Sequence, residues 1–283
     1  MDQVSSNGQI NHVSDTALMV AACRALETEL PDAFARDPFA SRLAGERGFA
    51  ILDAMPHSMV LRFGMAIRTR FLDELLGDVL AGDAIATVLS VGCGLDTRPW
   101  RLDLPSDLRW IEVDFPDVLD YKYGLLADQK PRCHLEHLSV DLNDPVQRMA
   151  MYGSASGRAL MITEGVLMYL PARTVEALAA EVHEHSGVAH WISDITTSGF
   201  SKALRGGQDR DHLDSVKAPD ALSGEQILDV LRTHGWTTAD MRSYIRDTAF
   251  TQERVRRIFG DRPPAPPPFA LDDPTGVHRF ARG

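Results

Sequence analysis

The chain reads Val88-Leu89-Ser90-Val91-Gly92-Cys93-Gly94-Leu95-Asp96-Thr97-Arg98 at the point that decides its fold. An apolar strand ends there in a Gly-x-Gly turn, and the two glycines let the backbone approach a ligand without an intervening Cβ atom. The next strand ends in Glu112-Val113-Asp114, where Asp114 follows Gly94 by 20 residues. An acid at that place can accept hydrogen bonds from both ribose hydroxyls. Together these features predict a nucleoside-binding site, although a glycine pair alone can also be a structural turn.

The loop after the glycines indicates which nucleoside cofactor the site would take. A dinucleotide site favours a third glycine, as in Gly-x-Gly-x-x-Gly, so that a helix N-terminus can hold a pyrophosphate. Here Thr97 occupies the third position and the bulky run Arg98-Pro99-Trp100 follows. A cofactor without phosphate fits this loop better. S-adenosylmethionine, which consists of adenosine, a sulfonium and an amino-acid tail, is therefore the predicted cofactor.

Composition restricts the class of partner and the cellular compartment. The 283 residues carry 29 basic and 40 acidic side chains, a net charge of −11. This balance disfavours nucleic acid or an anionic membrane as the main partner, because phosphate binding needs clustered Lys and Arg. It leaves room for a small acidic substrate. Cys23, Cys93 and Cys133 are scattered and odd in number, which favours a reducing compartment and predicts no metal site.

The N-terminal residues show no secretory pattern, and no run approaches the roughly 18 apolar residues of a membrane span. We therefore expect a cytoplasmic protein that does not contact a membrane.

Apolar periodicity predicts five strands alternating with helices. The expected strands cover 86–91, 108–113, 135–140, 159–163 and 188–193, and the expected helices lie near 116–128, 144–151 and 171–185. Such alternation is typical of a doubly wound α/β sheet, mainly parallel and covered on both faces. Beyond it, a capping box at Ser223 should open a helix over 227–234, and 236–246 with 276–282 should form an antiparallel strand pair.

The predicted organisation follows from these elements. Two helices, one from Ser14 and one over 58–80, precede the first strand and are expected to cap the mouth of the site. The expected parts are a flexible tail (1–13), an N-terminal helical cap (14–80), a cofactor-binding core (81–194), a substrate-side insert (195–222) and a C-terminal segment (223–283) that completes the core and contains a Pro-rich connector (263–268).

Four segments in this order carry a family resemblance. They are Val-Gly-Cys-Gly-Leu-Asp-Thr-Arg-Pro-Trp-Arg-Leu (91–102), Glu-Val-Asp-Phe-Pro (112–116), Val-Asp-Leu-Asn-Asp (140–144) and Thr-Glu-Gly-Val-Leu-Met-Tyr-Leu-Pro (163–171). They resemble the leucine carboxyl methyltransferase family, and within it the bacterial branch that includes polyketide-type O-methyltransferases. The likeness covers roughly 14–245. It implies the class I methyltransferase (Rossmann-like) fold with S-adenosylmethionine as methyl donor.

The resemblance also implies a role for each site residue. Arg68 would pair with the methionyl carboxylate and Glu164 would lie near the methionyl amine. Gly92 and Gly94 would admit the cofactor, Asp114 would hold the ribose, and Asp141 with Leu142 would frame the adenine. Structural alternatives stay open: Arg68 could form a solvated ion pair, Asp114 could cap the next helix, Asp141 could cap a turn, and Asp96 could order the loop rather than bind a ligand.

The resulting hypothesis is an O-methyltransferase that acts in line on a carboxylate or hydroxyl of a small molecule. A hydroxyl acceptor would need a general base, but none of the ten histidines falls in the four segments, so no catalytic residue is assigned. The alternatives are a cofactor-binding sensor or scaffold without catalysis and a nicotinamide-dependent oxidoreductase. Acceptor recognition is expected in the N-terminal helices and the insert, whose polar and aromatic candidates are Phe200, Lys202, Arg205, Arg210 and His212.

Overall fold

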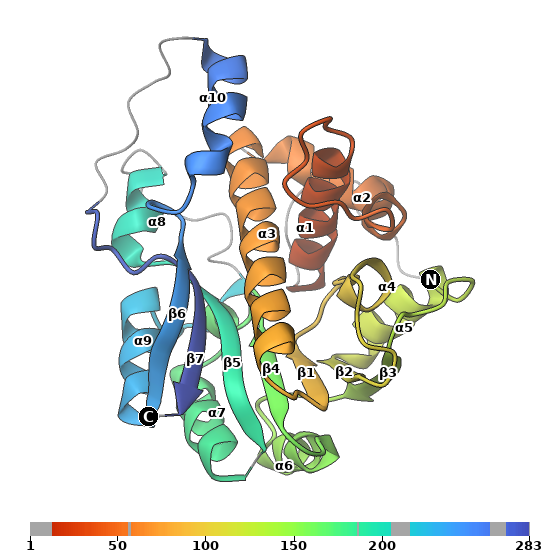
Figure 1. The fold of residues 1–283 in the computed structure, drawn as a ribbon, viewed down its shortest axis with the longest axis vertical. Coiled ribbons are helices and arrows are strands. Elements are labelled where there is room, and N and C mark those ends of the chain that lie inside the picture. The colour runs from red at the N-terminus through yellow and green to blue at the C-terminus, as the bar shows by residue number, and fades with distance from the viewer. Residues whose placement is uncertain (1–12, 56–57, 186, 205–215, 261–269, 283) are drawn as a thin grey trace.

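One seven-stranded sheet organises the protein. The computed structural model describes residues 13–282 except 56–57, 186, 205–215 and 261–269. Within this part of the chain the strand order is β3-β2-β1-β4-β5-β7-β6 (Figure 1). The strands are β1 (Thr87–Val91), β2 (Arg109–Asp114), β3 (His134–Ser139), β4 (Ala159–Thr163), β5 (Val188–Ile195), β6 (Trp236–Ser243) and β7 (Gly276–Arg282). The first five are parallel, and β7 is antiparallel to both of its neighbours. The predicted fold class is confirmed.

The helices fill the connections between these strands. Their bounds are α1 (Val13–Thr28), α2 (Ala40–Ala54), α3 (Ser58–Gly82), α4 (Arg98–Arg101), α5 (Pro116–Leu125), α6 (Pro145–Ser154), α7 (Ala172–His185), α8 (Ser198–Leu204), α9 (Gly224–Thr233) and α10 (Gln252–Phe259), with 3-10 turns η1 (Leu167–Tyr169) and η3 (Ala249–Thr251). The Ser223 capping box is present as predicted. Helix α7 begins at Ala172, so Pro171 precedes the helix, where its carbonyl accepts from the N–H groups of Thr174 and Val175.

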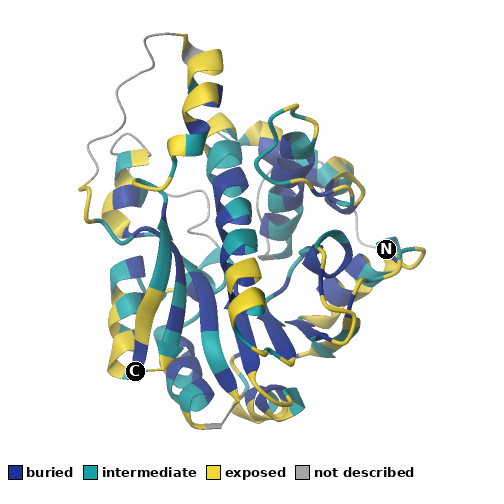
Figure 2. Ribbon diagram, in the orientation of Figure 1, coloured by how far each residue is buried: buried dark blue, intermediate teal, exposed yellow. Residues whose placement is uncertain are grey.

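Alternation along the strands builds a separate core on each face of the sheet. Val88, Leu160 and Ile192 pack with α3, whereas their sequence neighbours Leu89, Met161 and Trp191 pack with α6, α7 and α9. Successive side chains of a strand point to opposite faces, so a strand buried on both faces reads as a continuous apolar run. Figure 2 shows the resulting buried centre of the sheet. Because β1 to β5 are parallel, their carboxyl ends lie at one edge of the sheet.

The helices before β1 pack against two different parts of the protein. Helices α1 and α2 pack on each other and on Leu95, Trp100 and Leu126, beside the carboxyl edge of the sheet. The second half of α3 instead covers a face of the sheet through Leu72, Leu75 and Val79. The segment 14–80, expected to form a cap, therefore also supplies part of the main core.

Several expectations fall outside the described residues. These are residues 1–12 of the expected tail (1–13), the connector 263–268 and the candidate residues Arg205, Arg210 and His212. Residue 13 of the expected tail belongs instead to α1. Among the helices that are described, none is long and apolar enough to cross a bilayer.

Candidate functional site

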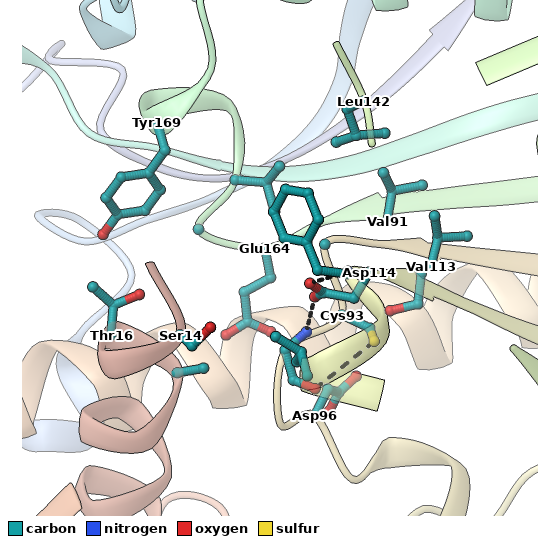
Figure 3. A pocket seen from close by; sticks show the side chains of 18 of the residues that line it. Ser14, Thr16, Val91, Cys93, Asp96, Val113, Asp114, Leu142, Glu164 and Tyr169 are labelled. Carbon is teal, nitrogen blue, oxygen red and sulfur yellow. Dashed lines mark hydrogen bonds between the residues drawn. The ribbon is translucent and has the colours of Figure 1, made fainter. Parts of the chain in front are cut away.

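A cavity of about 420 Å³ opens at the carboxyl edge of the sheet. All seven residues that the sequence singled out line it: Arg68, Gly92, Gly94, Asp114, Asp141, Leu142 and Glu164. The carboxyl ends of parallel strands meet at one edge, so residues following β1, β2, β3 and β4 converge there. Figure 3 shows the apolar side chains of Val91, Val113 and Leu142 at one end, while Thr16 of α1 and Tyr169 of η1 face each other at the other end.

The glycine turn brings the backbone to the wall of the cavity. Gly92 and Gly94 have φ values of 62° and 48°, in the left-handed region that favours glycine. A Cβ atom on Gly92 would lie 2.3 Å from Cγ2 of Val166, a residue of the loop after β4. The first glycine is thus required both by backbone conformation and by close approach of two loops.

Gly92→Ala is expected to destabilise the protein by about 1–3 kcal/mol, because alanine costs energy at positive φ and Val166 must move. Urea denaturation measures this change. Gly77→Ala serves as the matched control, since Gly77 lies exposed on α3 with nothing near its missing Cβ, where alanine should stabilise the helix. Equal stability of the Gly92 variant and the parent would contradict the role of this turn.

Asp114 connects the end of β2 to the glycine turn. Its Oδ2 accepts from the Gly94 N–H at 2.7 Å and its Oδ1 accepts from the Phe115 N–H at 2.8 Å (Figure 3). Burial raises the pKa of Asp114 above its ordinary value, and the two N–H groups oppose that rise. Helix α5 shows no side-chain cap, so Asp114 does not cap it. The carboxylate instead orders the glycine turn from a position on the cavity wall.

Arg68 and Glu164 form a buried ion pair at the centre of the site. Arg68 Nε lies 3.0 Å from Glu164 Oε1, and its Nη1 lies 3.3 Å from Oδ2 of Asp194 at the end of β5. The second oxygen of Glu164 lies 2.7 Å from Nη1 of Arg98. Burial would raise the pKa of Glu164, but Arg98 and Arg68 lower it below its ordinary value. Arg68 is therefore buried and doubly paired rather than part of a solvated ion pair.

Asp141 and Asp96 each order a loop while lining the cavity. Asp141 Oδ1 accepts from the backbone and side-chain amides of Asn143, at 2.9 and 3.1 Å, and so caps that turn. Asp96 accepts from the Arg98 backbone N–H and lies 3.1 Å from the Arg98 guanidinium. Burial opposes ionisation of Asp96, yet Arg98 and Lys122 lower its pKa below the ordinary value. These contacts match the loop-ordering alternatives for both residues.

Three residues with no predicted role organise the site. Arg24 of α1 donates through Nη2 to the Leu95 carbonyl at 2.6 Å, which anchors the glycine loop to the N-terminal helix. Asp194 accepts from the Gly165 N–H at 2.6 Å as well as pairing with Arg68. Arg98 is only 2% exposed. The single signal for Arg98 was its place inside the glycine segment. Arg24 stands in Arg-Ala-Leu-Glu (24–27), a further segment that resembles the family, while Asp194 had no signal.

A fully buried ion pair lies behind the glycine turn. Lys122 Nζ of α5 and Glu112 Oε1 of β2 are 2.7 Å apart, and both side chains are 0% exposed. The Tyr123 hydroxyl donates to the other Glu112 oxygen at 3.1 Å. Burial raises the pKa of Glu112, and Lys122 opposes the rise. Burial likewise raises the pKa of Cys93 well above its ordinary value, which disfavours the thiolate form that a nucleophile needs.

The chemistry available to the cavity is limited by its lining. No histidine contributes to it among the described residues, and that part of the chain holds no group of three or more residues able to bind a metal ion. Each lining carboxylate already accepts hydrogen bonds from backbone amides, an asparagine or arginines. The site can bind a polar ligand, but neither a histidine nor a carboxylate without a hydrogen-bond donor is present among its described residues to act as general base.

Comparisons with known proteins agree with this geometry. The family model for leucine carboxyl methyltransferase matches residues 17–183. A Streptomyces avermitilis protein that carries the name S-adenosyl-L-methionine-dependent methyltransferase is 30% identical over 281 residues, which cover 93% of each chain. A Mycolicibacterium smegmatis protein with the same name is 31% identical, covering 85% of this chain and 87% of the relative.

Two further matches differ in extent. A Streptomyces coelicolor protein, also named an S-adenosyl-L-methionine-dependent methyltransferase, is 35% identical over 60% of this chain, and the match spans 64% of that relative's length. The crystal structure of a DUF574-family protein from Streptomyces avermitilis aligns with a TM-score of 0.58 at 16% identity, covering 93% of this chain and 96% of that one. At such low identity the second match shows the fold alone.

Proposed function

Because the chain belongs to the leucine carboxyl methyltransferase family and is an S-adenosylmethionine-dependent methyltransferase, we propose that it methylates a carboxylate of a small-molecule acceptor. The cofactor supplies an electrophilic methyl group on its sulfonium. The chain's own residues must hold donor and acceptor in line and exclude water between them.

The residues around the cavity fit that cofactor. Asp114 would accept from the ribose hydroxyls, since each carboxylate oxygen has more than one acceptor site and one of each is used by a backbone amide. Asp141 and Leu142 would frame the adenine at the apolar end of the cavity. Arg68 would bind the methionyl carboxylate and Glu164 the methionyl amine. Gly92 and Gly94 would admit the cofactor because their positive φ values let the backbone turn along the cavity wall.

The class of methyl acceptor is inferred from the lack of an evident general base in the described lining of the cavity. A hydroxyl must lose its proton during methyl transfer, whereas a carboxylate is already a nucleophile at neutral pH. Arginines lower the pKa of Asp96 and Glu164, whereas burial raises the pKa of Asp114, which accepts from two backbone N–H groups. The described lining thus contains no histidine and no carboxylate that lacks a hydrogen-bond donor. This single observation supports a carboxylate acceptor over an alcohol. The proposal therefore names methyl ester formation as the reaction.

Methyl transfer to matched acceptors tests the proposal. Aliphatic and aromatic carboxylic acids, each paired with the corresponding primary alcohol, would be incubated with the protein and methyl-labelled S-adenosylmethionine. We expect label in the acids only, released as volatile methanol by mild alkali, because esters hydrolyse and ethers do not. Alkali-stable label in the alcohols would overturn the carboxylate assignment. Binding of S-adenosylhomocysteine without transfer to either class would favour a non-catalytic sensor, and binding of NAD alone would favour an oxidoreductase.

A further inference from the structure

Arg98 lies at the centre of a buried chain of alternating charges in the wall of the cavity. Its Nη1 is 2.7 Å from Glu164 Oε2 and 3.1 Å from Asp96 Oδ2. Its Nε is 2.7 Å from Oδ1 of Asp73 on α3. The rigid guanidinium fork is thus held by three carboxylates from three segments, and it fixes their relative positions.

Arg98 affects Arg68 through Glu164, which contacts both arginines. Glu164 presents one oxygen to Arg68 and the other to Arg98, so the two arginines share this carboxylate. Arg68 also faces Asp194, which means that it already meets two negative groups before any ligand arrives. A third carboxylate, that of the cofactor, can bind there only if part of this negative charge is balanced elsewhere. Arg98 carries the balancing charge.

We infer that Arg98 is a positioning residue for the amino-acid tail of the cofactor, acting by keeping the second oxygen of Glu164 off the Arg68 guanidinium. The inference rests on the proposed function, in which Arg68 binds the methionyl carboxylate. Without Arg98, both oxygens of Glu164 can close on the Arg68 guanidinium in a bidentate pair and compete with the ligand. Asp114 and Leu142, at the adenosine end, have no described hydrogen bond or ion pair with Arg98 or Glu164.

Arg101 provides a matched control within the same short helix. Its side chain is also buried, at 4% exposed, and it makes two hydrogen bonds to Asp73, at 2.7 and 2.8 Å. Unlike Arg98, it has no described hydrogen bond to Glu164 or Asp96, and it does not line the cavity. Removal of either arginine disturbs Asp73, but only removal of Arg98 frees Glu164.

The experiment compares Arg98→Met with Arg101→Met against two ligands. S-adenosylhomocysteine carries the amino-acid tail, whereas 5′-methylthioadenosine has the adenosine and sulfur without it. We expect Arg98→Met to weaken S-adenosylhomocysteine binding by about tenfold to a hundredfold and to leave 5′-methylthioadenosine binding unchanged. Arg101→Met should leave both affinities unchanged although its melting temperature falls. Calorimetry and ligand-observed NMR measure the affinities, and Arg98→Lys should rescue only in part.

A double-mutant cycle with Glu164→Gln tests the route of the effect. If Arg98 acts through Glu164, Arg98→Met should not lower the affinity for the tail further in the Glu164→Gln background. This double variant also carries the test if Arg98→Met alone fails to fold, because it removes the arginine together with its carboxylate partner. Equal loss of both ligands in Arg98→Met, or full additivity in the cycle, would overturn the inference. Failure of the parent protein to bind S-adenosylhomocysteine would instead refute the proposed function.

Discussion

Asp114→Ala is expected to weaken S-adenosylmethionine binding by at least about a hundredfold. Hydrogen bonds to an ionised acceptor contribute about 1.5–3 kcal/mol each, and a ribose offers two donors to this carboxylate. The substitution also removes the acceptor of the Gly94 N–H, at 2.7 Å, so of its described hydrogen bonds to β2 the glycine turn keeps only the backbone one from the Cys93 N–H to the Val113 carbonyl. Calorimetric titration of the purified variant with S-adenosylmethionine and S-adenosylhomocysteine measures the loss.

Asp117→Ala is the control for this experiment. Asp117 lies exposed in the first turn of α5, three residues beyond Asp114, and does not line the cavity. Its removal changes the net charge by the same amount without touching the proposed ribose site, so cofactor affinity should stay at the parent value. Affinity in Asp114→Ala within a few-fold of the parent would mean that the ribose is held elsewhere.

Lys122→Met should lower the melting temperature by roughly 10 °C, the largest stability change that we expect for a single substitution here. Removing one partner of a fully buried ion pair costs about 3–5 kcal/mol, because the remaining charge is left without compensation in a medium of low polarity. Glu112 is that remaining charge, 0% exposed and held otherwise by the Tyr123 hydroxyl alone among its described side-chain partners. Thermal unfolding followed by circular dichroism measures the change.

Two comparisons separate the charge effect from packing. The double variant Lys122→Met/Glu112→Leu removes both charges and should recover most of the lost stability, since well-packed apolar residues can replace a buried pair. Arg42→Met breaks the ion pair with Asp128, which has the same 2.7 Å distance but exposed side chains, and should not shift the melting temperature measurably. A double variant as unstable as Lys122→Met would show that packing, not charge, is responsible.

The sheet could be predicted because its signals are local. An apolar run ending in Gly92 marks β1, and the structure places that strand at Thr87–Val91 within the expected 86–91.

Helix α2 had no such signal, because Gly45 and Gly48 interrupt its sequence. A Cβ on Gly48 would lie 2.5 Å from the Leu18 carbonyl of α1, so this glycine allows two helices to pack closely. A residue that weakens the local helix signal is thus required by a contact 30 positions away.

Part of the candidate site could also be predicted from the sequence. Acids that follow strands of a parallel sheet must gather at one edge, and Asp114, Asp141 and Glu164 all line the cavity found there. Their partners were not predictable. The ion pairs Arg68–Asp194 and Arg98–Glu164 join positions 126 and 66 residues apart, and charged residues at such separations leave no periodic pattern. The roles of these residues toward the cofactor stay predictions for the binding experiments above.

The sequence by itself determined the α/β class, the glycine turn and the order of motifs, because backbone conformation and apolar periodicity depend on neighbouring residues. Only the tertiary structure decided where each buried charge finds its partner. It placed β7 between β5 and β6, Lys122 on Glu112, and Glu164 between Arg68 and Arg98. A charge can be buried only beside a compensating group, and that group is chosen by how distant elements pack.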